Sequence, residues 1–250
     1  MSEMILEIQN GNKNFEYDSI LANINLQIKP GDFISLLGPS GSGKTTLIRL
    51  LAGLDNWTSG EFKSNSTLKS SFVFQEPNLL GWRTVFENIN LPLELGEKKT
   101  DHQTLKNILK TVNLEPVSRH YPQELSGGMK MRASIARALI TKPNLLFMDE
   151  PFAALDEPTR EKLQEKLREI WELNSTTIVF VTHSIQEATF LSNRIIFLSG
   201  KPATIKKDYE PNLPKIRDSS TRSSIEYYNE LKNIRALYNN NPESRDSNES

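Results

Sequence analysis

The sequence predicts an α/β fold in which helices flank a mainly parallel central sheet. Residues 145–148 and 176–182 are short runs dominated by apolar and β-branched residues, which is typical of buried parallel strands. Between these two runs, Leu163, Leu167 and Trp171 recur at helical spacing. This alternation of strand and helix indicates a parallel sheet rather than a sandwich or a helical bundle.

A glycine-rich stretch at residues 38–46 fits the pattern G-x-x-x-x-G-K-[ST], the phosphate-binding P-loop. It lies between a predicted strand at 33–37 and a predicted helix at 47–51, and its glycines let backbone N–H groups converge on phosphate oxygens. The helix N-terminus would add its positive dipole end. A glycine-rich turn that binds nothing is the alternative. The sequence therefore predicts a P-loop NTPase, with candidate ATP ligands Gly38, Pro39, Ser40, Gly41, Ser42, Gly43, Lys44, Thr45 and Thr46.

Composition bounds the class of protein. The 250 residues carry a net charge of −1, so overall charge gives no argument for nucleic acid or an anionic membrane surface. There is no cysteine, which excludes disulfides and thiolate metal sites. The N-terminus lacks the basic region and apolar run of a signal peptide, and no stretch approaches the roughly 20 apolar residues that cross a bilayer. We expect a soluble, cytoplasmic chain that reaches a membrane only through partners.

The N-terminal segment predicts an antiparallel β subdomain. Residues 4–9 and 24–28 alternate apolar and polar side chains, the period of half-buried strands. Phe15 and Tyr17 lie in the predicted loop between them. Either ring could stack on an adenine, and an ordinary surface aromatic is an equal alternative.

Residues 76–122 are rich in prolines and in helical patterns such as Leu105 and Leu109, which predicts a helical insertion within the domain. A turn at residues 125–128 then opens a helix that ends near residue 140, with Ser126 placed as its N-cap. Gly127 and Gly128 would let a ligand approach the exposed N–H groups, and a plain helix cap is the alternative. We place the helical subdomain at about 76–140.

Polar side chains follow the predicted strands at one edge of the sheet. Asp149 and Glu150 end the 145–148 run, the Walker B arrangement expected downstream of a P-loop. Asp149 would support Mg²⁺ and Glu150 could polarise the attacking water, whereas a solvated acidic strand end is the alternative. Gln75 and His183 follow the neighbouring predicted strands. A lone histidine is more often structural, but ligands gather at this edge of an α/β sheet, which favours a chemical role for His183.

The C-terminal part predicts a helical extension at about 210–238. A capping-box pattern at residues 223–226 precedes a helical stripe of Tyr227, Leu231, Ile234 and Tyr238, most simply explained by packing against the body. We place a single domain at residues 1–238 and a polar, disordered tail at 239–250.

Taken together, these motifs resemble the ATP-binding cassette family, and the resemblance runs from about residue 6 to residue 238. Phe15 stands where the family places its adenine-stacking aromatic, which favours it over Tyr17. The motifs that carry the resemblance, in the family's order, are the P-loop, Gln75 as the Q-loop, residues 125–128 as the signature, Asp149 and Glu150 as Walker B, Asp156 as the D-loop, and His183 as the switch histidine.

The resemblance implies an ATPase that works as a homodimer with ATP and Mg²⁺. Two cassettes would face each other head to tail, and each ATP would lie between one chain's P-loop and the signature residues of the other. The implied catalytic roles are Glu150 as general base, His183 as holder of the γ-phosphate and water, and Gln75 and Asp156 as further catalytic residues. The resemblance also implies Thr45, Gln75 and Asp149 at the metal, and Ser126, Gly127 and Gly128 at the partner's ATP.

Residues 74–85 and 148–156 resemble the nitrate/sulfonate/taurine importer branch of the family, which also includes importers of vitamin precursors. Gly81, Ser184 and residues 192–193 depart from the branch's usual residues, which leaves the solute open without touching the ATP chemistry. The resemblance implies an importer subunit on the cytoplasmic face of the cell membrane, docked on integral permease chains, with an extracytoplasmic solute-binding protein and no nucleic acid.

Two other functions are weaker predictions. A soluble cassette that acts on nucleic acid or the ribosome usually carries a coiled-coil insertion or a second cassette, and this chain has neither pattern and no excess positive charge. A small-molecule kinase would explain Lys44 and Asp149 but would leave the signature stretch and His183 unused.

Residues 75–88 join the nucleotide edge to the insertion, so they could transmit a change at the γ-phosphate to the surface. Trp82 and Phe86 either pack inside the insertion or line a groove for a permease helix, with Arg83 and Glu87 as its polar edges.

Overall fold

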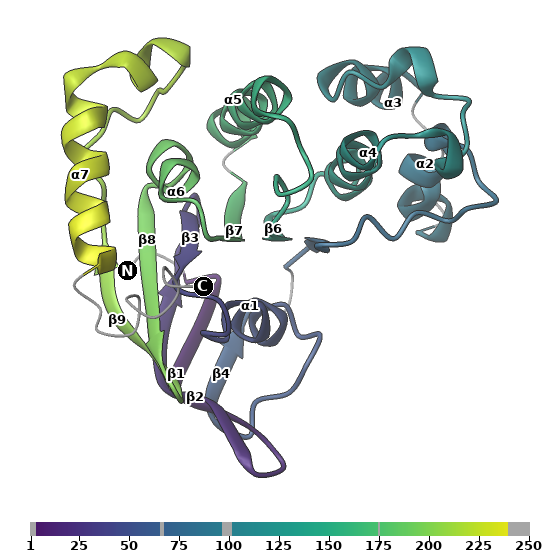
Figure 1. Ribbon diagram of the computed structural model, residues 1–250. Coiled ribbons are helices and arrows are strands. Elements are labelled where there is room, and N and C mark those ends of the chain that lie inside the picture. The colour runs from purple at the N-terminus through teal and green to yellow at the C-terminus, as the bar shows by residue number, and fades with distance from the viewer. Residues whose placement is uncertain (1–3, 66–67, 97–101, 175, 240–250) are drawn as a thin grey trace.

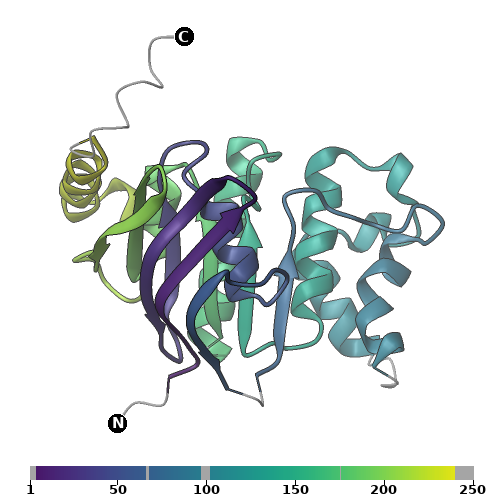
Figure 2. The same cartoon turned by 90° about the horizontal axis from the view of Figure 1, so that it is seen from below.

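The computed structural model describes residues 4–65, 68–96, 102–174 and 176–239, which form one sheet with helices on both faces (Figure 1). Helices α2, α3 and α4 gather at one end of the molecule and α7 lies at the other, as Figures 1 and 2 both show. The described helices are α1 (Lys44–Leu51), α2 (Val85–Leu95), α3 (His102–Thr111), α4 (Gly127–Leu139), α5 (Glu157–Asn174), α6 (Ile185–Leu191) and α7 (Ile225–Asn239), with 3₁₀ turns at Glu115–Val117, Pro122–Glu124 and Ser219–Ser223.

The sheet has the strand order β4-β1-β2-β9-β8-β3-β7-β6-β5. Strands β5, β6, β7, β3 and β8 are parallel neighbours, whereas β4, β1 and β2 pair antiparallel, as do β8 and β9. The predicted α/β fold with a mainly parallel centre and an antiparallel N-terminal part is therefore confirmed. The strands are β1 (Leu6–Phe15), β2 (Asp18–Ile28), β3 (Phe33–Leu37), β4 (Ser59–Ser64), β5 (Ser70–Val73), β6 (Leu145–Asp149), β7 (Thr177–Thr182), β8 (Arg194–Gly200) and β9 (Ala203–Tyr209).

The central strands are apolar on both faces because each face supports a separate core. In β7, Ile178 and Phe180 belong to a hydrophobic cluster that includes residues of α4 and α5. Val179 and Val181 belong to a second cluster, which includes residues of α1. The same alternation divides β6, since successive side chains of a strand point to opposite faces. Helices α1 and α5 are thus held on opposite faces of the strands that end at the candidate site.

The first two strands are longer than the predicted segments at 4–9 and 24–28, and Phe15 is the last residue of β1 rather than a loop residue. Beyond Gln9 the apolar alternation stops, and the register with β2 shifts at several points. The strand continues because it pairs with β2 on one side and β4 on the other. Asn12 strengthens this region by donating a side-chain hydrogen bond to Ser59 Oγ at 3.1 Å.

Local side-chain contacts stabilise the start of the helical insertion and partly bury one of its two predicted aromatic anchors. Thr84 and Glu87 form a capping box that starts α2, and Arg83 pairs with Glu94 at 2.7 Å. Phe86 is half-buried against the core, and its ring stacks on His102 with centroids 6.2 Å apart. Trp82, by contrast, is 75% exposed. Of the two predicted aromatic anchors, Phe86 therefore packs within the insertion and only Trp82 is free to meet a partner.

The C-terminal part of the chain adds two strands to the sheet before helix α7 begins. Strands β8 and β9 form a hairpin, and α7 then packs Tyr227 and Ile234 into the body, in agreement with the predicted stripe. Helix α7 ends at Asn239, and the remainder of the predicted disordered tail lies outside the described residues. In the part of the chain that the structure describes, no helix has both the length and the apolar character needed to span a bilayer.

Candidate functional site

The P-loop connects β3 to α1 as predicted, and its backbone turns tightly at two glycines. Gly41 and Gly43 have φ angles of 76° and 72°, in the left-handed region that L side chains rarely adopt. Gly43 is also the N-cap of α1, so the turn delivers the chain directly to the start of the helix. The exposed N–H groups at this end of α1 form a site that favours phosphate oxygens.

Gly38 opens the loop where the backbone passes close to β8. A Cβ atom at this position would lie 2.3 Å from the backbone oxygen of Leu198 and 2.8 Å from Ser42 Oγ. The first distance is far shorter than any real contact of a Cβ atom, and its partner is backbone that cannot rotate away. Glycine at position 38 is therefore required by the close packing of the loop against β8.

The Lys44 side chain lies along the inner side of the loop and is only 7% exposed. Its Nζ donates to the carbonyl oxygens of Gly38 and Pro39 at 2.9 and 2.7 Å, so the ammonium group is held where a bound phosphate would lie. Burial lowers the pKa of Lys44, and the nearby carboxylates of Glu150 and Asp149 oppose this shift.

Thr45 and Asp149 meet between α1 and the end of β6. The Thr45 hydroxyl donates to Asp149 Oδ1 at 3.2 Å, although the two residues are 104 positions apart in the sequence. Burial raises the pKa of Asp149, while the Thr45 hydrogen bond opposes the shift. A hydroxyl and a carboxylate are oxygen ligands of the kind that Mg²⁺ prefers, so this pair fits the predicted metal site.

Glu150 and His183 occupy the ends of neighbouring strands. Strands β6 and β7 pair in parallel with Asp149 opposite Val181, and the Glu150 N–H donates to the Val181 carbonyl at 3.1 Å. Glu150 has a φ of 46°, and its Oε2 lies 3.5 Å from His183 Nδ1. The structure thus brings the predicted base and the predicted switch histidine together beside the P-loop.

Gln75 and Asp156 are both exposed, and their described positions are given by neighbouring elements. Gln75 is exposed and lies two residues beyond the end of β5, which pairs with β6 through Val73 and Met148. Asp156 is exposed and accepts a hydrogen bond from the Thr159 N–H at 3.2 Å, within the first turn of α5. Its hydrogen bonds with Thr159 hold the pKa of Asp156 below its ordinary value.

The signature residues lie at the start of α4. Ser126 is the N-cap, as predicted, and accepts a hydrogen bond from the Met129 N–H at 3.3 Å. Ser126 and Gly127 are exposed, and a side chain at Gly127 would enter open space. Gly128 instead approaches Leu155, ahead of α5. The described contacts of these residues are therefore with their own helix and the D-loop, and their outer surface is available to a partner.

Phe15 presents its ring at the turn between β1 and β2. The side chain is 48% exposed, and the Lys13 ammonium lies 4.4 Å from the ring centroid. A side chain at Gly43 would meet Ile20 and Leu21 of β2, so this hairpin packs against the P-loop. The arrangement allows Phe15 to contact a base, whereas Tyr17 is fully exposed.

The sequence interpretation missed a polar network behind His183. The Thr182 hydroxyl donates to Glu187 Oε2 at 2.5 Å, and Arg160 of α5 lies 3.8 Å from the other Glu187 oxygen. Burial raises the pKa of Glu187, and these two partners oppose the shift. The sequence does contain a capping signal here, because Ser184 and Glu187 form an S-x-x-E pattern directly after His183. Ser184 is the N-cap of α6, as that pattern predicts.

A cavity also lies away from the nucleotide edge of the sheet. It has a volume of about 680 Å³ and lies at the opposite ends of the strands, where Pro30, Asn144 and Thr177 line it. The polar residues described above lie at the other edge, on the P-loop and on strand ends. Geometry and chemistry, rather than cavity size, therefore locate the candidate site.

Known proteins resemble this chain in sequence and in fold. A family model described as "ABC transporter" matches residues 21–153. The chain is 46% identical over 210 residues to an aliphatic sulfonates import ATP-binding protein of Bacillus cereus, covering 82% of this chain and 83% of that one. It is 42% identical over 223 residues to a nitrate import ATP-binding protein of Synechocystis sp., covering 84% of each. A dimeric, post-hydrolysis structure of the ATP-binding cassette MJ0796 with ADP and phosphate superimposes with a TM-score of 0.74 at 34% identity, covering 82% of this chain and 98% of that one.

Proposed function

Because the chain belongs to the ABC transporter family and is an ATPase of that family, we propose that it powers an importer of a small sulfonate-like or nitrate-like solute. The observation that carries the ATP-hydrolysis part of the proposal is the meeting of the P-loop, Asp149, Glu150 and His183 at one edge of the sheet. A protein that binds ATP without hydrolysing it would not need a carboxylate and an imidazole placed together beyond the P-loop.

The chain's own residues would divide the chemistry as follows. The N–H groups of residues 38–46 and the Lys44 ammonium would bind the β- and γ-phosphates, and the half-exposed Phe15 ring would stack on the adenine. Glu150 would accept a proton from the attacking water, and His183 would hold the water and the γ-phosphate in line. These roles suit phosphoryl transfer, where positioning and charge neutralisation lower the barrier.

The metal site is part of the proposal. Thr45, Asp149 and Gln75 would hold Mg²⁺, directly or through water, because their side chains offer only oxygen ligands and lie at the ends of α1, β6 and β5. The ion would neutralise charge on the phosphates when bound.

A complete site would need two chains. Ser126 and Gly127 are exposed at the start of α4, and the related cassette was solved as a dimer with nucleotide. We place the signature residues Ser126, Gly127 and Gly128 against the ATP of the opposite chain, with Asp156 beside the same interface. ATP would then join the two chains, and hydrolysis would release them.

The relatives' names guide the transport assignment. They are called import ATP-binding proteins for aliphatic sulfonates and for nitrate, both oxyanions. We place this protein on the cytoplasmic face of the membrane, docked on integral permease chains that receive solute from an extracytoplasmic binding protein. The nucleic-acid alternative is not favoured, since these relatives are import proteins and the net charge is −1.

The test is reconstitution with the permease chains that co-purify with this protein. Vesicles containing the complex, ATP and Mg²⁺ should take up a labelled alkanesulfonate or nitrate when the cognate binding protein is present, and uptake should stop without ATP. Uptake of a vitamin precursor alone would overturn the oxyanion assignment. If the protein binds no membrane that contains those permease chains, the importer assignment fails.

A further inference from the structure

Helix α6 connects the switch histidine to the C-terminal part of the chain. It begins two residues after His183, with Ser184 as its N-cap, and ends at Leu191. A helix leaves its last carbonyl groups without intrahelical partners, and basic side chains near this end can bind them and stabilise the helix. The last turn of α6, all of it described, contains no basic residue.

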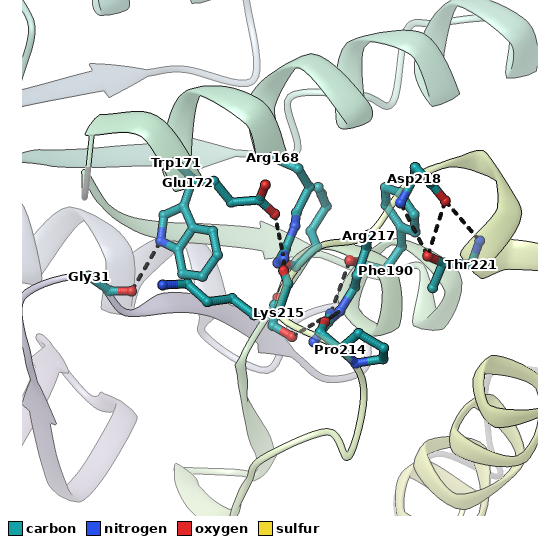
Figure 3. A network of polar contacts seen from close by, with 12 residues as sticks. Gly31, Arg168, Trp171, Glu172, Phe190, Pro214, Lys215, Arg217, Asp218 and Thr221 are labelled. Atoms are coloured by element: carbon teal, nitrogen blue, oxygen red, sulfur yellow. Dashed lines mark hydrogen bonds and ion pairs between the residues drawn. The ribbon is translucent and has the colours of Figure 1, made fainter.

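Arg217, which lies outside α6, binds carbonyl groups at the end of this helix. It lies in the segment between β9 and the 3₁₀ turn at Ser219–Ser223, and its side chain is buried. Its Nη1 donates to the carbonyl oxygens of Thr189, Phe190 and Ser192 at 2.9, 3.0 and 2.9 Å. Its Nε donates to the Pro214 carbonyl at 2.8 Å, which fixes the guanidinium plane (Figure 3).

Arg168 binds the remaining carbonyl of the same helix end. Its Nη1 donates to Leu191 O at 2.8 Å, and its Nη2 hydrogen-bonds to Glu172 and to the Lys215 carbonyl, as Figure 3 shows. Burial lowers the pKa of both arginines to about 10, and for Arg217 the neighbouring Arg168 charge adds to this effect. Both guanidinium groups therefore remain protonated at neutral pH and oppose the negative end of the α6 dipole.

The other end of α6 is joined to the catalytic edge. Thr182 binds Glu187 and also accepts a hydrogen bond from the Ser184 N–H at 3.0 Å, so the residues on both sides of His183 are fixed to the helix. Seven helical residues span only about 10 Å. A displacement at the Arg217 end would therefore be transmitted to the backbone of His183.

We infer that Arg217 is a positioning residue for ATP hydrolysis, which holds His183 beside Glu150 by binding the carboxyl end of α6. The inference rests on the proposed function and deepens it, since it assigns part of the C-terminal segment to the chemical step. Two neighbours support it: Arg222 lies 3.6 Å from the Phe190 ring centroid, and the Tyr227 hydroxyl donates to the Gln186 carbonyl at 3.2 Å. The C-terminal segment thus contacts α6 along its whole length.

The first experiment compares Arg217→Met with Arg235→Met in the full chain. Arg235 is exposed on α7, so it gives the same substitution away from α6. We expect Arg217→Met to lower kcat for ATP about tenfold to a hundredfold, because small displacements of catalytic groups are costly. The KM for ATP and the affinity for a fluorescent ATP analogue should change less than about twofold, since the P-loop is untouched. Equal loss of affinity and kcat would overturn the inference.

A double-mutant cycle with His183→Ala separates positioning from general destabilisation. If Arg217 acts through His183, Arg217→Met should cause no further loss once His183 has been removed. A further tenfold loss in the His183→Ala background would show that Arg217 acts by another route. If His183→Ala itself leaves hydrolysis unchanged, the proposed role of His183 fails instead, so the two failures are distinguishable.

Chemical rescue keeps the inference testable if Arg217→Met folds poorly. Millimolar guanidinium should partly restore kcat in Arg217→Ala, whereas equal concentrations of sodium chloride or urea should not. Arg217→Lys should be intermediate, because an ammonium group can bind the α6 carbonyls but lacks the fixed Nε contact to Pro214. Rescue of Arg217→Ala by salt alone, or full activity of Arg217→Ala without guanidinium, would overturn the inference.

Discussion

His183 Nδ1 lies 3.5 Å from Glu150 Oε2, across the ends of two adjacent parallel strands. The parallel register contributes to this pairing, because it places Asp149 opposite Val181 and so brings the carboxyl ends of β6 and β7 to the same edge of the sheet. The positive φ of Glu150 ends the strand at the point where its side chain meets the imidazole. Backbone geometry thereby brings the candidate proton acceptor and the candidate switch histidine together.

Glu150→Gln should retain ATP binding and lose nearly all hydrolysis. The amide preserves the shape of the side chain but cannot accept a proton from water, a contribution worth about a hundredfold or more. With ATP and Mg²⁺ the variant should accumulate as a dimer in size-exclusion chromatography. Turnover within about threefold of the unmutated protein would remove Glu150 as the base.

Ser126→Arg should leave the ATP affinity of the monomer nearly unchanged while hydrolysis collapses. Its hydroxyl caps α4 in its own chain, so the free energy of unfolding should fall by only about 1 kcal/mol. Mixing this variant with a Lys44→Ala chain should restore one competent site per mixed dimer, formed by one intact P-loop and one intact signature. An ATP affinity loss as large as that of Lys44→Ala would instead place Ser126 in its own chain's pocket.

Trp82→Ser should weaken docking on permease-containing membranes about tenfold or more, as loss of an aromatic interface anchor does, without altering ATP binding. Phe86→Asp is the contrasting variant, because Phe86 packs against the core and on His102. We expect it to lower the free energy of unfolding by roughly 1–3 kcal/mol. Co-sedimentation and thermal melting measure the two effects separately, and full docking by Trp82→Ser would exclude this residue from the coupling surface.

Gly38→Ala should destabilise the protein by about 1–3 kcal/mol and weaken ATP binding, because the new methyl group would press on the Leu198 carbonyl. Gly81→Ala is the matched control, since a Cβ atom at Gly81 would enter open space. Thermal melting with and without ATP measures both effects. Equal melting temperatures for the two variants would contradict the tight approach of the P-loop to β8.

Glu187→Gln should stabilise the protein at neutral pH. Burial raises the pKa of Glu187 above its ordinary value of 4.5, so the ionised carboxylate is less favourable in the folded chain than in the unfolded chain. The contribution of Glu187 to the stability of the folded chain should therefore fall as pH rises from about 4.5 through the raised folded pKa. The advantage of the glutamine variant should grow over that window and then level off. Denaturant unfolding at several pH values measures it, and an advantage that shrinks with rising pH would contradict the assignment.

Local patterns predicted where most of the candidate catalytic groups lie in the fold. The P-loop, the acids at the end of β6 and the Ser126 cap depend on backbone geometry over a few residues, which glycine spacing, apolar runs and capping residues encode directly. For the same reason, helix α5 follows from its helical periodicity and strand β7 from its continuous apolar and β-branched run. The resemblance to a family added the order of the motifs and the expectation of a dimer.

Only the folded structure shows the order of the strands and the contact partners of Phe15 and Phe86. The same is true of the arginine side chains that bind the end of α6. Nothing near position 217 in the sequence indicates that its guanidinium binds carbonyl groups 25 to 28 residues earlier, or that Arg168 completes the set from another helix. Such contacts depend on which elements pack side by side, and a side chain's local sequence does not encode the position of a distant backbone group. Local sequence patterns therefore predicted where the candidate catalytic groups lie, whereas long-range packing sets the contacts that hold them in place.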